Sequence, residues 1–124
     1  SAGLPMALAT SSRRTHADLS LDEAGLVGFF AAEVTGEEVH HGKPHPEIFL
    51  TAAERLGVTP GACLVLEDAP AGLAAAVAGG MRCLWVPNDK TRALAVGVPV
   101  DGVMDDLYQA RTWIEARIGE GPVL

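Results

Sequence analysis

The sequence predicts an α/β protein in which a parallel sheet is covered by helices on both faces. Short apolar runs bounded by turn residues alternate along the chain with segments of helical periodicity, and the connections between them are short. The apolar runs are continuous rather than alternating in polarity, which is typical of strands buried on both faces. Because 124 residues are too few for two domains of ordinary size, we expect a single three-layer αβα domain over residues 1–124.

Five apolar runs are the expected strands, at residues 6–9, 30–34, 63–66, 83–86 and, most weakly, 102–104. The clearest helix starts at Pro46, since proline suits a first helical turn, and Gly57 provides its end. Its apolar stripe consists of Ile48, Phe49, Ala52, Ala53 and Leu56.

Three further segments have helical patterns. Residues 70–78 follow Asp68, which is placed as an N-terminal cap, and they stop at Gly79. The many alanines of this segment permit a close approach to the sheet. Residues 107–118 form a last helix, and residues 15–25 form a more ambiguous one. The expected apolar side of the last helix consists of Leu107, Ala110, Ile114 and Ile118.

Charge and composition exclude several classes of function. Acidic residues outnumber basic ones by 16 to 9, so a broad attraction to nucleic acid or to an anionic membrane is not expected. The longest apolar runs fall well short of the roughly 20 residues that span a bilayer. The first residues do not have the pattern of a secretory signal. Cys63 and Cys83 lie singly in apolar runs and are expected to be buried thiols in a reducing compartment, the cytoplasm.

Polar residues at strand ends are the candidates for function, because ligands of an open parallel sheet bind beyond the carboxyl ends of its strands. The first cluster, Thr10, Ser11 and Ser12, follows the first strand and precedes a helical pattern. Its hydroxyl and backbone N–H groups could hold a phosphate oxygen. Ordinary helix capping would explain the same residues.

Lys43 forms the second candidate, within the segment GKPHPEIF at residues 42–49. Pro44 and Pro46 stiffen the approach to the helix. A lysine beside a helix N-terminus opposes the helix dipole, so its presence makes sense if an anion lies between the two. A solvated surface lysine is the alternative.

Glu67 and Asp68 form the third candidate, directly after the apolar run at 63–66. Adjacent carboxylates repel unless a cation neutralises them, and Mg²⁺ is the typical hard cation with oxygen ligands. The alternative is a capping Asp beside a solvated Glu.

The histidines at positions 40, 41 and 45 are not expected to bind a metal. Pro44 prevents a helical presentation of His41 and His45, and no carboxylate or thiol at ligand spacing completes a set.

The segments ALATSS, GKPHPEIF and LVLEDAPAGLAAA, in this order and spacing, closely resemble the second, third and fourth motifs of the haloacid dehalogenase superfamily. The branch they resemble most is the phosphoglycolate phosphatase and β-phosphoglucomutase type. This resemblance implies a Rossmann-like core and a magnesium-dependent phosphatase or phosphomutase. The implied substrate is a small phosphate monoester.

The resemblance also implies a role for each candidate residue. Thr10 matches the hydroxyl that bonds the transferring phosphoryl group, with Ser11 and Ser12 as supporting phosphate contacts. Lys43 matches the cation that balances charge between the phosphoryl oxygens and a nucleophilic carboxylate. Asp68 matches the direct Mg²⁺ ligand, and Glu67 the acid that supports the metal through a water.

The family's first motif, DxDGT, supplies the attacking Asp that forms an aspartyl-phosphate. No segment of these 124 residues fits it. Asp101 and Gly102 come closest, but Pro99 stands where the first Asp belongs. We therefore expect the chain to be an N-terminally truncated core, inactive alone, whose upstream coding sequence encodes a strand ending in DxDGT.

The family's first strand is central, between the strands that carry the second and fourth motifs, and the helical cap follows it. Without that strand, the sheet would have to re-pair or borrow a strand from another chain, giving a homodimer by strand exchange. A catalytically silent domain that binds phosphate or another chain is the alternative function.

Overall fold

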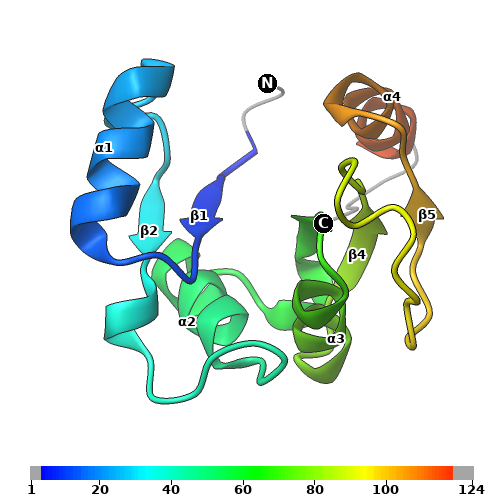
Figure 1. The fold of residues 1–124 in the computed structure, drawn as a ribbon, viewed down its shortest axis with the longest axis horizontal. Coiled ribbons are helices and arrows are strands. Elements are labelled where there is room, and N and C mark those ends of the chain that lie inside the picture. Colours follow the sequence, from blue (N-terminus) through cyan, green and yellow to red (C-terminus); the bar gives the residue numbers. More distant parts are fainter. Residues whose placement is uncertain (1–3, 119–124) are drawn as a thin grey trace.

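The computed structural model describes residues 4–118, which form parallel strands and helices in alternation (Figure 1). The strands are β1 (Ala7–Ala9), β2 (Ala32–Val34), β3 (Leu64–Glu67), β4 (Arg82–Trp85) and β5 (Gly102–Val103). The helices are α1 (Arg14–Ala24), α2 (Glu47–Leu56), α3 (Pro70–Ala78) and α4 (Leu107–Ile118), with short 3-10 helices η1 (Gly36–Glu38) and η2 (Pro60–Ala62). All five expected strands and all four expected helices are present.

The strands form two separate sheets. One contains β1 and β2, and the other has the order β3-β4-β5. Every pairing is parallel, as predicted, with Ala7 opposite Ala32 in the first sheet and Val65 opposite Cys83 in the second. Within residues 4–118, no strand pairing joins β1 to β3. The sheet is therefore divided at the place where the resemblance puts a central strand. Of the two expected alternatives, closure of the gap by re-pairing does not occur in the described residues, and strand exchange with another chain stays a prediction.

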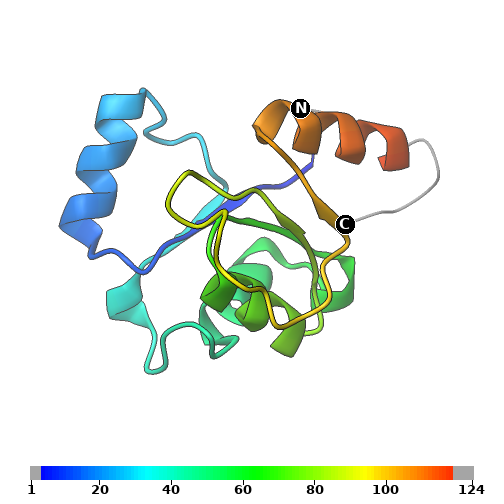
Figure 2. The ribbon, with the colours of Figure 1, turned by 45° about the vertical axis from the view of Figure 1, so that its right-hand side comes forward.

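Two helices cover one side of both sheets. α2 packs on β1 and β2, α3 packs on β3 and β4, and α2 also contacts α3. Figures 1 and 2 show α1 and α4 on the other side, which completes the three-layer arrangement. The helix layer of α2 and α3 thus bridges the division between the sheets.

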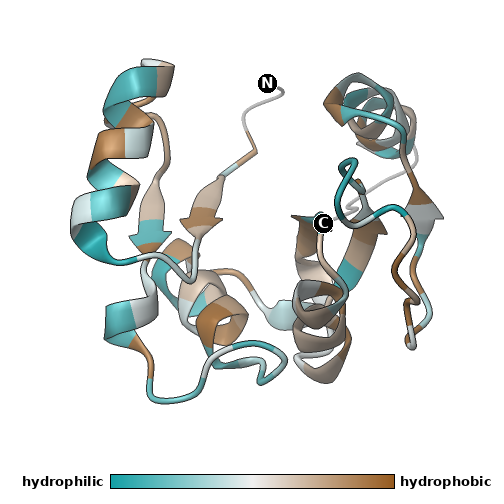
Figure 3. Ribbon diagram, in the orientation of Figure 1, coloured by the Kyte–Doolittle hydropathy of each residue, from teal (hydrophilic) through white to brown (hydrophobic). Residues whose placement is uncertain are grey.

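The core lies between this helix layer and the strands. Its fully buried side chains include Val34 of β2, Ile48 of α2, Leu73 of α3 and Cys83 of β4. Ala75 and Ala76 of α3 have no exposed surface, which confirms that the alanines of this segment allow a close approach to the sheet. Figure 3 shows α3 as a mostly hydrophobic helix.

Two predicted details are wrong. Asp68 does not cap α3, whose N-cap is Ala69 with no side-chain hydrogen bond. On the expected apolar side of α4, Ala110 is buried and Ile114 is partly buried, but Leu107, the first residue of the helix, is 65% exposed. The side chain of Ile118 lies outside the described part of the chain. In the described residues, no helix combines the length and apolar character needed to cross a membrane.

Candidate active site

Lys43 and Glu67 meet as a largely buried ion pair. Nζ of Lys43 lies 3.0 Å from Oε2 of Glu67, with 14% and 12% of the two side chains exposed. The ammonium group also lies 5.0 Å from the ring centroid of Phe49, in the cation–π arrangement. Lys43 is thus not a solvated surface lysine. Its segment, which precedes α2, carries a positive charge to the carboxyl end of β3.

Two polar groups hold the carboxyl group of Glu67 in place, the Lys43 ammonium and the backbone N–H of Ala69. Burial raises the pKa of Glu67 above its usual value, and the nearby Lys43 ammonium opposes that shift. The backbone N–H of Ala69 lies 3.4 Å from Oε1 and points at it. Both carboxylate oxygens of Glu67 therefore already have a partner, which leaves this residue better suited to supporting a metal through water than to binding it directly.

Gly72 makes room for the Glu67 side chain. A Cβ atom at this position of α3 would overlap with Cγ, Cδ and Oε2 of Glu67. Sequence reasoning gave Gly72 no role, although a glycine inside a helix of alanines was a usable signal of close packing.

Asp68 is exposed, and its side chain turns toward the loop after β4. Its Oδ2 accepts a hydrogen bond of 2.9 Å from Nδ2 of Asn88, and its backbone oxygen accepts one of 2.9 Å from Nε1 of Trp85. Asn88 is itself fixed, since its Oδ1 accepts hydrogen bonds from the backbone N–H groups of Lys90 and Thr91. The Asn88 bond uses Oδ2 alone, so Oδ1 of this exposed residue is not engaged by Asn88.

Asn88 is a site residue that sequence reasoning missed. It follows Pro87 in the turn at the carboxyl end of β4, the same edge of the sheet that carries Glu67 and Asp68. The rule that ligands bind at this edge was a signal that could have found it. A pocket of about 330 Å³ adjoins the two carboxylates, lined by Leu66, Glu67, Asp68, Val86 and Leu107.

Thr10 shapes the loop that follows β1. Its Oγ1 accepts a hydrogen bond of 3.1 Å from the backbone N–H of Ser12, so the hydroxyl closes a turn. The N-cap of α1 is Arg13, with no side-chain cap bond, so the helix-capping explanation for Thr10, Ser11 and Ser12 is wrong. The loop packs closely on the segment after β2, because a Cβ atom at Gly36 would overlap with the backbone of Ser11.

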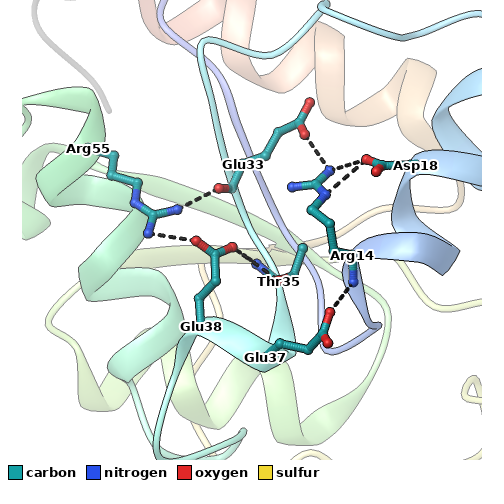
Figure 4. Close-up of polar contacts among 7 residues, drawn as sticks. All are labelled: Arg14, Asp18, Glu33, Thr35, Glu37, Glu38 and Arg55. Atoms are coloured by element: carbon teal, nitrogen blue, oxygen red, sulfur yellow. Dashed lines mark hydrogen bonds and ion pairs between the residues drawn. The ribbon is translucent and has the colours of Figure 1, made fainter.

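An ion pair of Arg14 holds α1 against β2 (Figure 4). Nη2 of Arg14 lies 2.6 Å from Oε1 of Glu33 in β2 and 2.6 Å from Oδ1 of Asp18, one turn further along α1. The backbone N–H of Arg14 also donates to Glu37 of η1. These contacts fix the end of the loop that carries Thr10.

A second group of contacts ties η1 to α2 (Figure 4). Nη2 of Arg55 lies 2.7 Å from Oε1 of Glu38, and Nη1 of Arg55 donates to the backbone oxygen of Glu33. Glu38 also accepts hydrogen bonds from the backbone N–H and hydroxyl of Thr35. The hydrogen bond from Arg55 is the largest cause that lowers the pKa of Glu38, to about 2.

The structure brings some of the predicted site residues together and leaves others apart. Lys43, Glu67 and Asp68 share the carboxyl end of β3. Thr10, Ser11 and Ser12 lie beyond the end of β1, on the other sheet. In the described residues, no hydrogen bond joins these two groups.

The donor set at β3 fits a magnesium ion. Mg²⁺ in phosphoryl-transfer sites is bound by one or two carboxylates and keeps several waters. Asp68 offers an exposed carboxylate oxygen that Asn88 does not use, and Glu67 lies beside it. Asp68 therefore suits direct coordination, and Glu67 suits coordination through a water.

Comparisons with known proteins agree with this geometry. A family model for haloacid dehalogenase-like hydrolases matches residues 1–80. The chain is 46% identical over 82 residues to the fructose-1-phosphate phosphatase YqaB of Escherichia coli, covering 66% of this chain and 44% of that protein.

Solved structures show the same likeness. A β-phosphoglucomutase from Clostridium difficile is 28% identical with a TM-score of 0.78, covering 96% of this chain and 51% of that one. A hydrolase from Deinococcus radiodurans, solved with bound phosphate and sodium, is 27% identical with a TM-score of 0.82, covering 93% of this chain and 53% of that one. The chain thus spans about half the length of the proteins that it matches.

Proposed function

Because the chain belongs to the haloacid dehalogenase-like hydrolases, we propose that it forms the metal- and phosphate-binding part of a magnesium-dependent phosphohydrolase. The proposed reaction is phosphoryl transfer from a small phosphate monoester through an aspartyl-phosphate. The observation that carries this proposal is the group at the end of β3, where the largely buried Lys43 ammonium contacts Glu67 beside the exposed Asp68.

Phosphoryl transfer requires positioning and the neutralisation of charge on the phosphoryl oxygens. Magnesium, when bound, supplies part of that neutralisation. Lys43 supplies another part, since its ammonium can hydrogen-bond a phosphoryl oxygen while it stays paired with Glu67. Asp68 holds the metal through the oxygen that Asn88 does not engage, and Asn88 keeps that carboxylate turned in one direction. Thr10 donates its hydroxyl hydrogen to a phosphoryl oxygen while its Oγ1 still accepts from Ser12.

The attacking carboxylate has no counterpart among these residues, because no segment of the 124 matches DxDGT. We propose that this chain alone does not turn over substrate. The unpaired edges of β1 and β3 support a missing strand between Thr10 and Asp68. Reading the coding sequence upstream of Ser1 tests this point, and finding no strand that ends in DxDGT there would contradict it.

A binding experiment tests the proposed metal site directly. The purified chain is titrated with Mg²⁺ in the presence of inorganic phosphate by calorimetry, alongside Asp68→Asn and, as a control on the exposed side of α2, Glu54→Gln. We expect Asp68→Asn to weaken Mg²⁺ binding by at least about tenfold and Glu54→Gln to leave it unchanged. Equal binding by all three proteins would remove Asp68 from the site.

Turnover is measured with the same protein. Hydrolysis of a generic phosphate monoester in Mg²⁺ is expected to stay at the rate without protein. Hydrolysis at a rate typical of enzymes, about 1 to 1000 turnovers per second, would show that the nucleophile lies within these 124 residues.

The second candidate is a catalytically silent module that exchanges strands with a second copy. The observation that favours it is the pair of strand edges, on β1 and β3, that have no partner in the described residues. Mass in solution across a range of concentrations distinguishes the two. A tight dimer that does not bind Mg²⁺ favours this candidate. A reducing cytoplasmic setting is proposed with either function, and it is supported by Cys63 and Cys83 both being free thiols.

A further inference from the structure

The loop before α2 brings together three side chains that the proposed active site does not use. Ring nitrogens of His41 and His45 and a carboxylate oxygen of Glu47 all lie within 4.8 Å of one another. The two imidazole rings are stacked, with 4.5 Å between centroids and 23° between planes. The sequence led us to expect no metal site here, because no carboxylate was at ligand spacing. The structure contradicts this premise about spacing, since the turn at Pro44 brings both histidines close to the carboxylate of Glu47, the first residue of α2.

The backbone of the loop holds the Glu47 carboxylate in place. Its Oε2 accepts a hydrogen bond of 2.9 Å from the N–H of His40, and its Oε1 accepts one of 3.0 Å from the N–H of His41. The first of these bonds is the main cause that lowers the pKa of Glu47, so the group is anionic at neutral pH. A carboxylate that is already charged and oriented is a ready metal ligand.

Both histidine rings are also oriented by Glu47. Nδ1 of His41 lies 3.1 Å from Oε1 of Glu47, and Nδ1 of His45 accepts a hydrogen bond of 3.1 Å from the backbone N–H of Glu47. All three potential ligands are accessible from solvent, since both histidines are exposed and Glu47 is partly so. An ion can therefore reach the cluster without opening the fold.

We propose that His41, His45 and Glu47 bind a divalent transition-metal ion of the Zn²⁺ type, with water in the remaining position. Two imidazoles and one carboxylate are a donor set that zinc accepts, and nitrogen donors disfavour Mg²⁺ and Ca²⁺. Ligand atoms about 2 Å from a tetrahedral ion lie roughly 3.3 Å apart, so small side-chain rotations bring this set from 4.8 Å to bonding geometry. Coordination through the Nδ1 atoms exchanges their present hydrogen bonds for bonds to the ion.

The three ligands lie at both ends of the loop that carries Lys43, so a bound ion would affect the stability of this loop. His41 and His45 flank Lys43 and Pro44 in the sequence, and Glu47 begins α2. An ion bound by all three residues cross-links both ends of the segment that carries Lys43. The bound ion should therefore stabilise this loop and raise the midpoint of thermal unfolding. The proposal does not depend on the proposed function, since it concerns binding alone.

The test uses the tag-free, chelator-treated 124-residue chain. Zn²⁺ and Mg²⁺ are titrated separately by calorimetry, and Co²⁺ serves as a probe whose visible absorption reports tetrahedral nitrogen and oxygen ligands. We expect one Zn²⁺ per chain, a higher unfolding midpoint with Zn²⁺, and no competition by Mg²⁺ in excess.

Matched variants locate the ion. His41→Ala, His45→Ala and Glu47→Gln are each expected to weaken Zn²⁺ binding by at least about tenfold. His40→Ala is the control, because His40 lies in the same loop, is exposed and keeps its backbone N–H in the variant, while its side chain is not one of the three potential ligands. Far-UV circular dichroism checks that each variant is folded. If an alanine variant does not fold, Glu47→Gln still tests the site, because it keeps the shape of the Glu47 side chain.

Two results would overturn the proposal. One is the absence of stoichiometric Zn²⁺ binding by the intact chain. The other is Zn²⁺ binding that survives in both His41→Ala and His45→Ala. If such binding is lost in Asp68→Asn, the ion lies at β3, and if it is lost when the thiols are blocked, the ion lies at a cysteine. Loss of Mg²⁺ binding at Asp68 with Zn²⁺ binding intact would leave this site in place, so failure of the proposed function and failure of this inference are distinguishable.

Discussion

Two strand–loop–helix units carry the candidate site, and they are held in the fold by different forces. In the first, β1 leads through Thr10 to α1, which buries only Ala17 and Leu21. In the second, β3 leads through Asp68 to α3, where Gly72, Leu73, Ala75 and Ala76 are buried. Figure 3 shows the contrast, with hydrophilic and hydrophobic turns mixed in α1 and a mostly hydrophobic α3.

In the first unit, an ion pair supplies part of the attachment that apolar packing supplies in the second. The contacts of α1 with β2 and η1 include the ion pair of Arg14 with Glu33, in which the Arg14 side chain is 39% exposed. Exposed ion pairs are weak and are screened by salt, whereas burial of apolar surface depends little on pH or salt. We infer that the unit carrying Asp68 is rigid under most conditions, and that the unit carrying Thr10 depends on charge.

The largest effect is expected from removing packing in the second unit. Leu73→Ala leaves a cavity under α3 at a side chain with no exposed surface, and should lower the free energy of unfolding by about 2 to 5 kcal/mol. Urea denaturation measures this loss. Leu19→Ala in α1 is the matched control, since Leu19 is 55% exposed and its removal should cost less than about 0.5 kcal/mol. Similar losses in the two helices would refute the comparison.

A smaller loss is expected when Lys43 is replaced. Lys43→Met keeps the packing on Phe49 but leaves the Glu67 carboxylate without its cation. The free energy of unfolding should fall by about 2 to 3 kcal/mol at pH 7, below the range for a fully buried pair because both side chains keep some exposure. Urea denaturation at several pH values measures it.

The pH dependence of the stability loss in Lys43→Met tests whether the unpaired charge of Glu67 causes that loss. The pKa of Glu67 is raised in the folded protein, so ionisation of this group disfavours folding once the pH rises above its usual pKa of 4.5. Removing Lys43 raises that pKa further. The deficit of Lys43→Met should therefore shrink as the pH falls toward 4.5, and Glu67→Gln should relieve it at pH 7. A deficit that stays constant with pH would contradict this account of the pair.

Gly72→Ala tests the close contact between α3 and Glu67. Alanine raises intrinsic helix propensity by about 1 kcal/mol, but its Cβ atom would overlap with the Glu67 side chain. We expect a net loss of about 1 to 2 kcal/mol, measured by thermal and urea unfolding. Gly61→Ala, where no atom lies within 4 Å of the added Cβ, serves as the control and should be close to neutral. A stabilised Gly72→Ala protein would show that Glu67 can move without cost.

Much of the fold follows from local patterns in the sequence. The helix between Pro46 and Gly57 has a proline at its start and a glycine with φ 71° at its end, so its bounds could be predicted closely. The strands could be located because parallel strands are continuously apolar, although, of the strands described, only β4 has more than one buried residue. That Glu67 and Asp68 need a cation could be predicted because adjacent carboxylates repel, but the expected cation was Mg²⁺, and the ion pair of Glu67 with Lys43 was not predicted.

Other features depend on contacts between residues distant in the sequence, and local patterns do not contain them. Asp68 looked like a helix cap, but its side chain bonds Asn88, which lies next to it only because β3 pairs with β4. Glu47 joins His41 and His45 only because the intervening turn reverses the chain. Leu107 was placed on the buried side of α4 by periodicity alone, and it is exposed beside the pocket at Asp68.

The smallest effect is expected in the charged unit, where it should vary with pH. The pKa of Glu38 is lowered to about 2, with the hydrogen bond from Arg55 as the largest cause, so this carboxylate stabilises the fold above its usual pKa of 4.5. That contribution is lost as the pH falls from 4.5 toward 2. Glu38→Gln should cost roughly 0.5 to 1 kcal/mol at pH 7 and low salt, less in high salt, and nothing near pH 2. Urea unfolding measures the loss, and Glu54→Gln on the same helix layer is the control. If the free energy of unfolding of Glu38→Gln is still reduced at pH 2, packing rather than charge holds η1 against α2.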